Sequence, residues 1–223
     1  MLRRLFGNRE SDPRDLGWFD RAYASRLGRR YATFRAAFAS LLERDARPTI
    51  VETGCVREKN DYSAGYSTVL LGELLRRTGG RLFTVDLSAK NIALCRRLTR
   101  RYAGLIEYSV GDSVEFLRAW VLAHPGAAID LLYLDSFDYP PADDPAGREA
   151  SQLHCRNELE AAFPALSANA LVLIDDGDLP GGGKPLLAKR RLAELGWTCL
   201  LDDYQTLWRA PGVSGSAASS AAD

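Results

Sequence analysis

The sequence predicts an α/β protein whose doubly wound, mainly parallel sheet has seven strands, an antiparallel edge hairpin and an N-terminal helical extension. Short segments rich in branched residues alternate with amphipathic segments of helix length along most of the chain. Such alternation implies parallel βαβ units joined by right-handed crossovers. Acidic residues follow most of the predicted strands, which is typical of a sheet edge that binds a ligand. The 223 residues fit a single hydrophobic core with terminal extensions.

The spacing of apolar residues gives the individual elements. The segment 16–43 repeats apolar residues at helical spacing and predicts one long helix that covers the sheet. Strands are predicted at 49–52, 81–86, 105–110, 129–135, 171–175, 197–201 and 205–208, and helices at 68–77, 88–102, 113–123, 149–166 and 185–195. The last two strands are close enough in sequence to form the hairpin. We therefore place an extension at 1–47, the main domain at 48–210 and a tail, predicted to be disordered, at 211–223.

The composition of the chain argues against several classes of binding partner. Twenty-nine basic residues balance twenty-nine acidic ones, so no net positive field favours nucleic acid. The four cysteines lack the spacing of a metal site or a disulfide framework, which predicts reduced thiols and a cytoplasmic protein. The apolar element at the start is too short for a signal peptide, and no run approaches the roughly 18 apolar residues of a membrane span. We expect neither nucleic acid nor a membrane as partner.

The carboxyl ends of the predicted strands are unusually acidic. The acidic residues at these ends are Glu52, Asp86, Asp112, Asp135, Asp175 and Asp176. Each one alone is explained equally well as a turn or N-cap residue, but the whole series favours a binding edge. Asp86 has the position of an acid that accepts both ribose hydroxyls of an adenosine. The turn at 111–113 is suited to hold the adenine, with Asp112 accepting from the exocyclic amine and Ser113 capping the next helix.

Six short motifs carry a family resemblance. They are Val51-Glu52-Thr53-Gly54-Cys55, Gly65-Tyr66-Ser67-Thr68, Thr84-Val85-Asp86, Gly111-Asp112-Ser113, Tyr133-Leu134-Asp135-Ser136 and Leu173-Ile174-Asp175-Asp176. In order and separation they resemble the class I S-adenosylmethionine-dependent methyltransferases, from about residue 49 to residue 208. The resemblance implies a Rossmann-like fold with S-adenosyl-L-methionine as cofactor.

The same resemblance assigns residues to parts of the cofactor. Its methionine portion is expected beside Glu52 and Gly54, its ribose at Asp86, and its adenine at Asp112 and Ser113. A polar stretch at 56–64 replaces the family's short glycine turn, so Arg57, Gly65 and Ser67 are added as candidates for methionine recognition. Asp135, which ends the fourth strand, is included among the residues expected at the cofactor.

Three of the acids predict a metal ion. Asp135, Asp175 and Asp176 end neighbouring strands, about 4.8 Å apart, and like charges this close either raise a pKa or bind a cation. Magnesium suits an all-oxygen site that keeps waters for substrate oxygens to displace. The arrangement resembles the metal-dependent O-methyltransferases of the catechol and macrocin types, which implies that the cation holds the acceptor oxygen.

Two residues are candidates for the general base. Asp138 stands where the resembling families often carry lysine or histidine, and a base, a fourth metal ligand and a surface turn residue are equally open for it. His154 follows the loop 140–147 and is an alternative base or an ordinary helix-surface histidine. The sequence GDLPGGGK at 177–184 is not followed by the Ser or Thr of a phosphate-binding loop, so we expect a flexible lid or acceptor-binding loop there.

The function predicted from the sequence is methylation of a small-molecule or sugar hydroxyl. A nicotinamide-dependent oxidoreductase is an alternative, although G-x-G-x-x-G is missing after the first strand. An aminopropyl transferase lacks a second acidic motif for a polyamine. A non-catalytic cofactor-binding or scaffold protein remains the alternative from another class, with the helix at 16–43 as the surface of a homodimer or as a lid over the acceptor.

Overall fold

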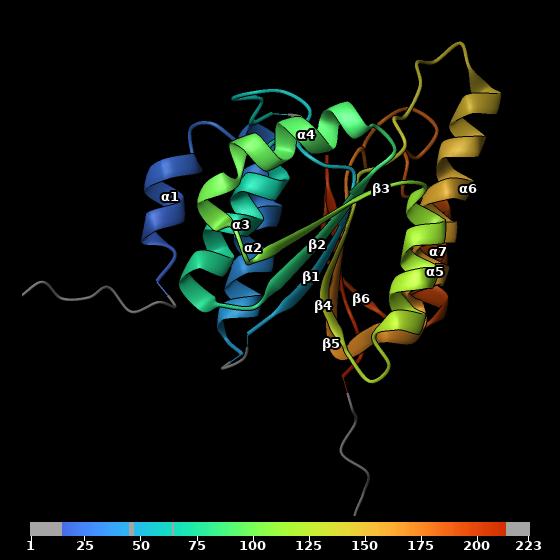
Figure 1. Cartoon of the computed structure of the whole chain (residues 1–223). Coiled ribbons are helices and arrows are strands. Elements are labelled where there is room, and N and C mark those ends of the chain that lie inside the picture. The colour runs from blue at the N-terminus through green and yellow to red at the C-terminus, as the bar shows by residue number, and fades with distance from the viewer. Residues whose placement is uncertain (1–14, 45–46, 64, 213–223) are drawn as a thin grey trace, which may run out of the picture.

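The computed structural model describes residues 15–44, 47–63 and 65–212. One seven-stranded sheet lies between two layers of helices, in the strand order β3-β2-β1-β4-β5-β7-β6 (Figure 1). Its strands are β1 (Thr49–Thr53), β2 (Arg81–Asp86), β3 (Ile106–Val110), β4 (Ile129–Leu134), β5 (Leu166–Ile174), β6 (Thr198–Asp202) and β7 (Thr206–Arg209). The α-helices are α1 (Gly17–Tyr23), α2 (Tyr31–Leu42), α3 (Ser67–Thr78), α4 (Ala89–Leu98), α5 (Ser113–Ala123), α6 (Pro145–Ala162) and α7 (Leu186–Glu194).

The topology confirms the predicted fold class. Strands β1 to β5 pair in parallel, β7 pairs antiparallel with β5, and β6 pairs antiparallel with β7 at the edge. Strand order reverses between β1 and β4, which is the switch point where open α/β sheets bind ligands at the carboxyl ends of their strands. In the described part of the chain, no helix has the length and apolar character needed to cross a membrane.

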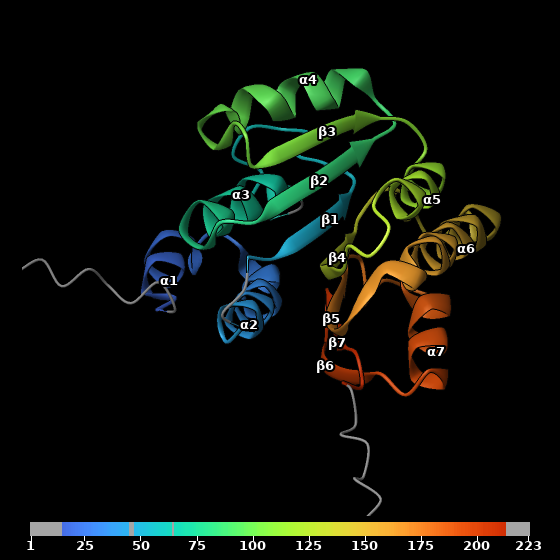
Figure 2. The same ribbon diagram turned by 60° about the horizontal axis from the view of Figure 1, so that its bottom comes forward.

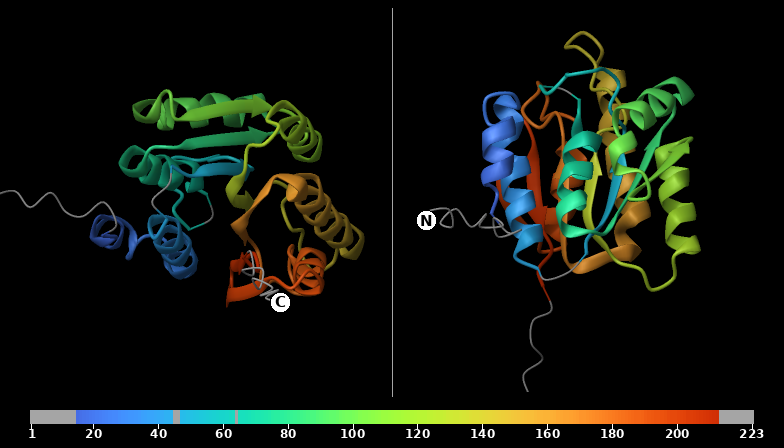
Figure 3. Two further views of the ribbon diagram at one scale, coloured as in Figure 1. Left: turned by 90° about the horizontal axis from the view of Figure 1, so that it is seen from below. Right: turned by 60° about the vertical axis from the view of Figure 1, so that its left-hand side comes forward.

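Successive side chains of each strand face opposite helix layers, because the side-chain period of a strand is two. On β4, Leu131 and Tyr133 pack in the cluster with α1, α2 and α3, whereas Leu132 and Leu134 pack in the cluster with α5, α6 and α7. The central strands are therefore apolar on both faces, as parallel strands covered by helices should be. Figures 2 and 3 show the two helix layers on either side of the sheet.

The N-terminal segment corrects one prediction. In place of a single long helix at 16–43, the chain forms α1, a 3₁₀ turn η1 (Gly28–Arg30) and α2. Gly28 has a φ of 52°, a left-handed conformation that costs glycine little and interrupts a helix. The two shorter helices pack Phe19, Phe34 and Phe38 into the same buried cluster as the sheet.

The boundaries around α6 and β5 also differ from those predicted. Helix α6 begins at Pro145, where Asp144 caps it by accepting from the backbone N–H of Gly147 at 2.8 Å. Proline at a first helical position and aspartate before it are a common helix start. The helix ends at Ala162 and, after a 3₁₀ turn η3 (Phe163–Ala165), β5 begins at Leu166, five residues before the predicted strand. The predicted disordered tail from residue 213 onward lies outside the described residues.

Candidate active site

The carboxyl ends of the central strands lie in register along one edge of the sheet. Three backbone hydrogen bonds connect them. The N–H of Gly54 donates to the carbonyl of Val85 at 2.8 Å, and the N–H of Asp135 donates to the carbonyl of Thr53 at 2.9 Å. The N–H of Asp175 donates to the carbonyl of Leu134 at 3.2 Å. Each strand is thereby tied to its neighbour just where the acidic residues begin. A Cβ atom on Gly54 would lie 2.2 Å from the carbonyl oxygen of Asp135, so only glycine fits between these two strand ends.

A hollow of about 210 Å³ opens at this edge between the ends of β1, β2, β3 and β4. The residues that line it are Gly54, Arg57, Val85, Asp86, Leu87, Asn91, Gly111, Asp112, Ser113, Ser136, Phe137 and His154. Five of these were predicted from the sequence to bind the cofactor: Gly54, Arg57, Asp86, Asp112 and Ser113. The structure thus brings together residues from four separate motifs.

The carboxylate of Asp86 is fixed by its surroundings. Its Oδ1 accepts from the backbone N–H of Ser88 at 2.8 Å, and both oxygens lie within 3.2 Å of the amide nitrogen of Asn91. The backbone N–H of Cys55 also donates to Oδ2, at 3.3 Å. A carboxylate held in this way is preorganised to accept a pair of hydroxyls without losing side-chain freedom on binding.

The turn after β3 joins the hollow to α5. Asp112 caps α5 by accepting from the backbone N–H of Glu115 at 3.0 Å, and the hydroxyl of Ser113 lies 2.9 Å from Nε2 of His154. His154 also contacts Glu158 at 3.6 Å, and this contact raises the pKa of the imidazole above its usual value although partial burial opposes it. The imidazole therefore lies beside the turn at 111–113.

Glu52 lies beneath the hollow rather than in its lining. It is fully buried, and its Oε2 accepts from the hydroxyls of Thr68 at 2.8 Å and Thr84 at 2.7 Å, while Oε1 has no hydrogen-bond partner among the described residues. Burial raises the pKa of Glu52 to about 7, although the neighbouring hydroxyl groups of Ser67, Thr84 and Thr68 oppose the shift. Gly65 and Ser67 are also outside the lining, and the carbonyl of Gly65 accepts from the buried guanidinium of Arg30.

The three acids predicted to hold a metal ion do meet, but two cations lie among them. Lys184 Nζ is 3.0 Å from Asp135 Oδ1 and 3.2 Å from Asp176 Oδ2, and Arg30 Nη2 is 3.2 Å from Asp175 Oδ2. Burial and the charge of Asp175 raise the pKa of Asp135 to about 7, against the lowering effect of Lys184. Burial alone lowers the pKa of Lys184, but the surrounding carboxylates hold it above its usual value.

Asp138, the other residue predicted as a base, lies at the surface. It forms an ion pair with Arg57, with Nη1 at 2.8 Å from Oδ1, and both side chains are about half or more exposed. This pair joins the loop after β1 to the loop after β4. Arg57 lines the hollow, so the pair lies at its rim.

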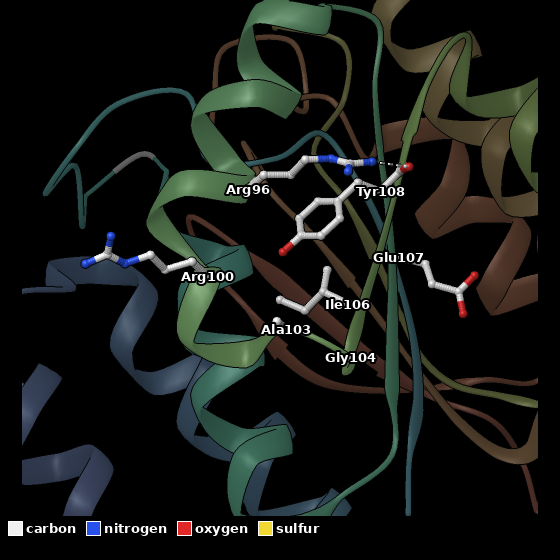
Figure 4. A pocket seen from close by; sticks show the side chains of 7 residues that line it. All are labelled: Arg96, Arg100, Ala103, Gly104, Ile106, Glu107 and Tyr108. Carbon is white, nitrogen blue, oxygen red and sulfur yellow. Dashed lines mark hydrogen bonds between the residues drawn. The ribbon is translucent and has the colours of Figure 1, made fainter.

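A second hollow lies away from this edge, between α4 and β3 (Figure 4). It has about 540 Å³ and is lined by Arg96, Arg100, Ala103, Gly104, Ile106, Glu107 and Tyr108. Arg96 donates to the backbone carbonyl of Tyr108 and lies over its ring. None of the predicted site residues is in this lining, and it is not at the carboxyl ends of the strands. The smaller hollow is therefore the candidate active site.

Several residues of this edge were not identified from the sequence. Asn91 lies about one helical turn beyond Ser88, the N-cap of α4. Its position five residues after Asp86 was the sequence signal that could have indicated a contact between the two side chains. Arg30 and Gln205, which come from two distant segments, converge on Asp175 together with Tyr133, whose motif was noted without a role for its hydroxyl. Nothing in the local sequence distinguishes Arg30 from the other arginines of the N-terminal segment.

Several solved methyltransferase structures resemble the fold of this chain. The O-methyltransferase NovP matches with a TM-score of 0.55 at 16% identity, over 80% of this chain and 78% of that one. The O-methyltransferase TomG from Streptomyces achromogenes, solved with SAM, matches at 0.54 and 18% over 93% of each chain. The calicheamicin methyltransferase CalS11 matches at 0.59 and 15%, over 92% and 94%. No curated protein matches the sequence.

A family model described as a methyltransferase domain matches residues 62–177, more than half of the chain. This span runs from the loop before α3 to the acid pair after β5, so it includes the turns that carry Asp86, Asp112 and Asp135. The chain therefore belongs to this methyltransferase domain family and is a methyltransferase.

Proposed function

We propose that this protein transfers the methyl group of S-adenosyl-L-methionine to a hydroxyl oxygen of a small molecule or sugar. The observation that carries the proposal is the hollow at the strand switch point, where the fixed carboxylate of Asp86 and the turn at 111–113 face one space. The solved neighbours, among them TomG with SAM and CalS11, a TDP-rhamnose 3'-O-methyltransferase, support the same activity.

The lining of the hollow suits an adenosine. Asp86 would accept both ribose hydroxyls, because its oxygens are already oriented by Ser88 and Asn91. Leu87 and Phe137 are 78% and 41% exposed and both line the hollow, and such exposed apolar side chains are suited to the two faces of a purine ring. Asp112 would then accept from the exocyclic amine at the edge of that ring.

The backbone around Gly54 would hold the methionine portion of the cofactor. Gly54 has a φ of 80° and no side chain, so its backbone approaches any ligand at the ends of β1 and β4 closely. Arg57 at the rim offers a cation for the carboxylate of the ligand. When bound, the cofactor supplies an electrophilic methyl group on a sulfonium, and the protein's part is to hold the acceptor oxygen in line with it.

The acceptor is expected on the side of Asp135, where β4 and β5 end. The predicted bases, Asp138 and His154, have other partners in the structure: Arg57 for the first and Ser113 for the second. Their roles as bases stay predictions. The predicted magnesium ion fits this edge poorly, because Lys184 and Arg30 already bind the three carboxylates, and no cluster suited to a metal ion occurs among the described residues.

Calorimetric titration with S-adenosyl-L-methionine tests the proposal. We expect saturable binding by the native protein and at least about tenfold weaker binding by Asp86→Ala, since loss of even one hydrogen bond to a charged group costs about 1.5–3 kcal/mol. Asp202→Ala is the control, because Asp202 pairs with Lys189 away from the hollow. Binding of a nicotinamide dinucleotide in place of S-adenosyl-L-methionine would refute the proposal, and so would native affinity in Asp86→Ala.

A further inference from the structure

A buried ammonium lies where the sequence predicts a divalent metal ion. The side chain of Lys184 is 1% exposed, and its Nζ lies within ion-pair distance of both Asp135 and Asp176. Asp135 and Asp176 follow the ends of β4 and β5, which are neighbouring parallel strands beside the cofactor edge. Lys184 thus joins the two carboxylates that a metal ion would otherwise join.

The oxygens of the three acids all have partners within the chain. Asp135 is bound by Lys184 at Oδ1, and its Oδ2 lies 3.2 Å from the hydroxyl oxygen of Tyr133. Asp176 is bound by Lys184 at Oδ2 and by the hydroxyl of Tyr204 at Oδ1. Oδ1 of Asp175 accepts from the backbone N–H of Asp176, and Oδ2 accepts from Tyr133 and lies against Arg30. A divalent ion would have to displace the ammonium to reach two of these carboxylates.

Backbone contacts of the loop before α7 hold Lys184 in position. Lys184 donates its backbone N–H to the carbonyl of Asp176 at 3.1 Å, which closes the loop 177–183 back onto the end of β5. A Cβ atom on Gly183, whose φ is 65°, would lie 2.1 Å from that same carbonyl, so the closure requires glycine. The side-chain amide of Gln152 donates to the carbonyls of Gly181 and Gly183 at 3.2 and 3.0 Å. The segment expected to be a flexible lid is therefore anchored on α6.

The charges at this edge are nearly balanced without an ion. Three carboxylates face two buried cations, Lys184 and Arg30, and the hydroxyl oxygen of Tyr133 lies between Asp135 and Asp175, at 3.2 and 2.7 Å from their Oδ2 atoms. Removing one partner of a buried ion pair leaves an uncompensated charge, which is strongly unfavourable. The carboxylates alone would attract a divalent cation, but with Lys184 in place the attraction is largely cancelled.

We infer that Lys184 is the resident cation of this site and that methyl transfer by this protein requires no divalent metal. The inference rests on the proposed function. Lys184 acts as a positioning residue: it holds Asp135 and Asp176 together at the acceptor side of the edge and supplies the positive charge there.

Manganese binding measured by electron paramagnetic resonance tests this inference without an acceptor. We expect no saturable binding of Mn²⁺ to the full-length native protein at millimolar concentration. Lys184→Met removes the ammonium and should create a site for one Mn²⁺ per chain, which a second change, Asp176→Asn, should abolish. Lys184→Gln is the alternative variant if the methionine variant fails to fold. Lys189→Met, which removes an exposed lysine paired with Asp202, should bind no more Mn²⁺ than the native protein.

Two results would overturn the inference: one tightly bound Mn²⁺ in the native protein that Asp176→Asn removes, or folded Lys184 variants that gain no Mn²⁺. The same preparations are titrated with S-adenosyl-L-methionine after treatment with EDTA. We expect native affinity to be unchanged by the chelator. Failure of the native protein to bind the cofactor would refute the proposed function, whereas the manganese result reports on Lys184 alone.

Discussion

The buried carboxyl group of Glu52 makes the stability of this protein depend on pH, and Glu52→Gln should remove that dependence. Glu52 is fully buried, and two threonine hydroxyls satisfy only one of its oxygens. Burial raises its pKa from 4.5 to about 7 in the folded protein. Glutamine has the same shape and can accept the same two hydrogen bonds, but it carries no charge at any pH used.

The sign and size of the effect follow from proton linkage. Below pH 4.5, Glu52 is protonated in both the folded and the unfolded state, so its ionisation does not lower the free energy of unfolding. Between pH 4.5 and pH 7 the unfolded chain releases the proton first, so the folded state is progressively disfavoured. A shift of about 2.5 units, at 1.36 kcal/mol per unit, gives about 3 kcal/mol above pH 7. Relative to the native protein, Glu52→Gln should therefore gain about 3 kcal/mol of unfolding free energy between pH 4.5 and pH 8.

Urea unfolding of the cofactor-free protein at a series of pH values measures this difference. Glu73→Gln is the matched control, because hydrogen bonds from Arg76, Tyr102 and Arg77 outweigh burial and lower the pKa of Glu73 to about 2. Glu73 is ionised in both states above pH 5, so its variant should be less stable by an amount that does not change up to pH 8. A difference between native protein and Glu52→Gln that stays constant with pH would refute the assignment of a raised pKa to Glu52.

Two further substitutions test the geometry of the hollow. Gly54→Ala would place a Cβ atom 2.2 Å from the carbonyl of Asp135 and should abolish binding of S-adenosyl-L-methionine in calorimetry as well as lower the melting temperature. Gly104→Ala has a similar φ of 85° but open space around it, so it should show only the backbone strain of about 1 kcal/mol and keep native affinity. Asp112→Ala removes an N-cap and should cost about 1 kcal/mol of stability together with cofactor affinity. Asp144→Ala removes the cap of α6 and should cost similar stability with affinity unchanged, and equal affinities for these two variants would contradict a role for Asp112 in adenine binding.

The strands and helices of the main domain could be predicted from the sequence because their signals are local. Alternating branched segments and helix-length segments mark β1 to β4 within one residue or so of their observed ends. The order of Asp86, Asp112 and Asp135 along the chain also indicates the cofactor edge, since all parallel strands end on the same side. The start of α6 at Pro145 had a local signal in Asp144, and the break at Gly28 depended on a single glycine within an otherwise helical pattern.

Only the tertiary structure decided which cations balance the three acids at the ends of β4 and β5. Asp135, Asp175 and Asp176 are visible in the sequence as a set of like charges, and from them alone a metal ion is the natural expectation. Arg30 lies 103 residues before its partner Tyr133, and Lys184 lies 49 residues after Asp135. Neither cation is marked in the sequence as a partner of these acids, because ion pairs form between side chains that folding brings together in space. The sequence by itself determined which groups end the strands, and packing of the turn η1 and of the loop before α7 determined which charges those groups meet.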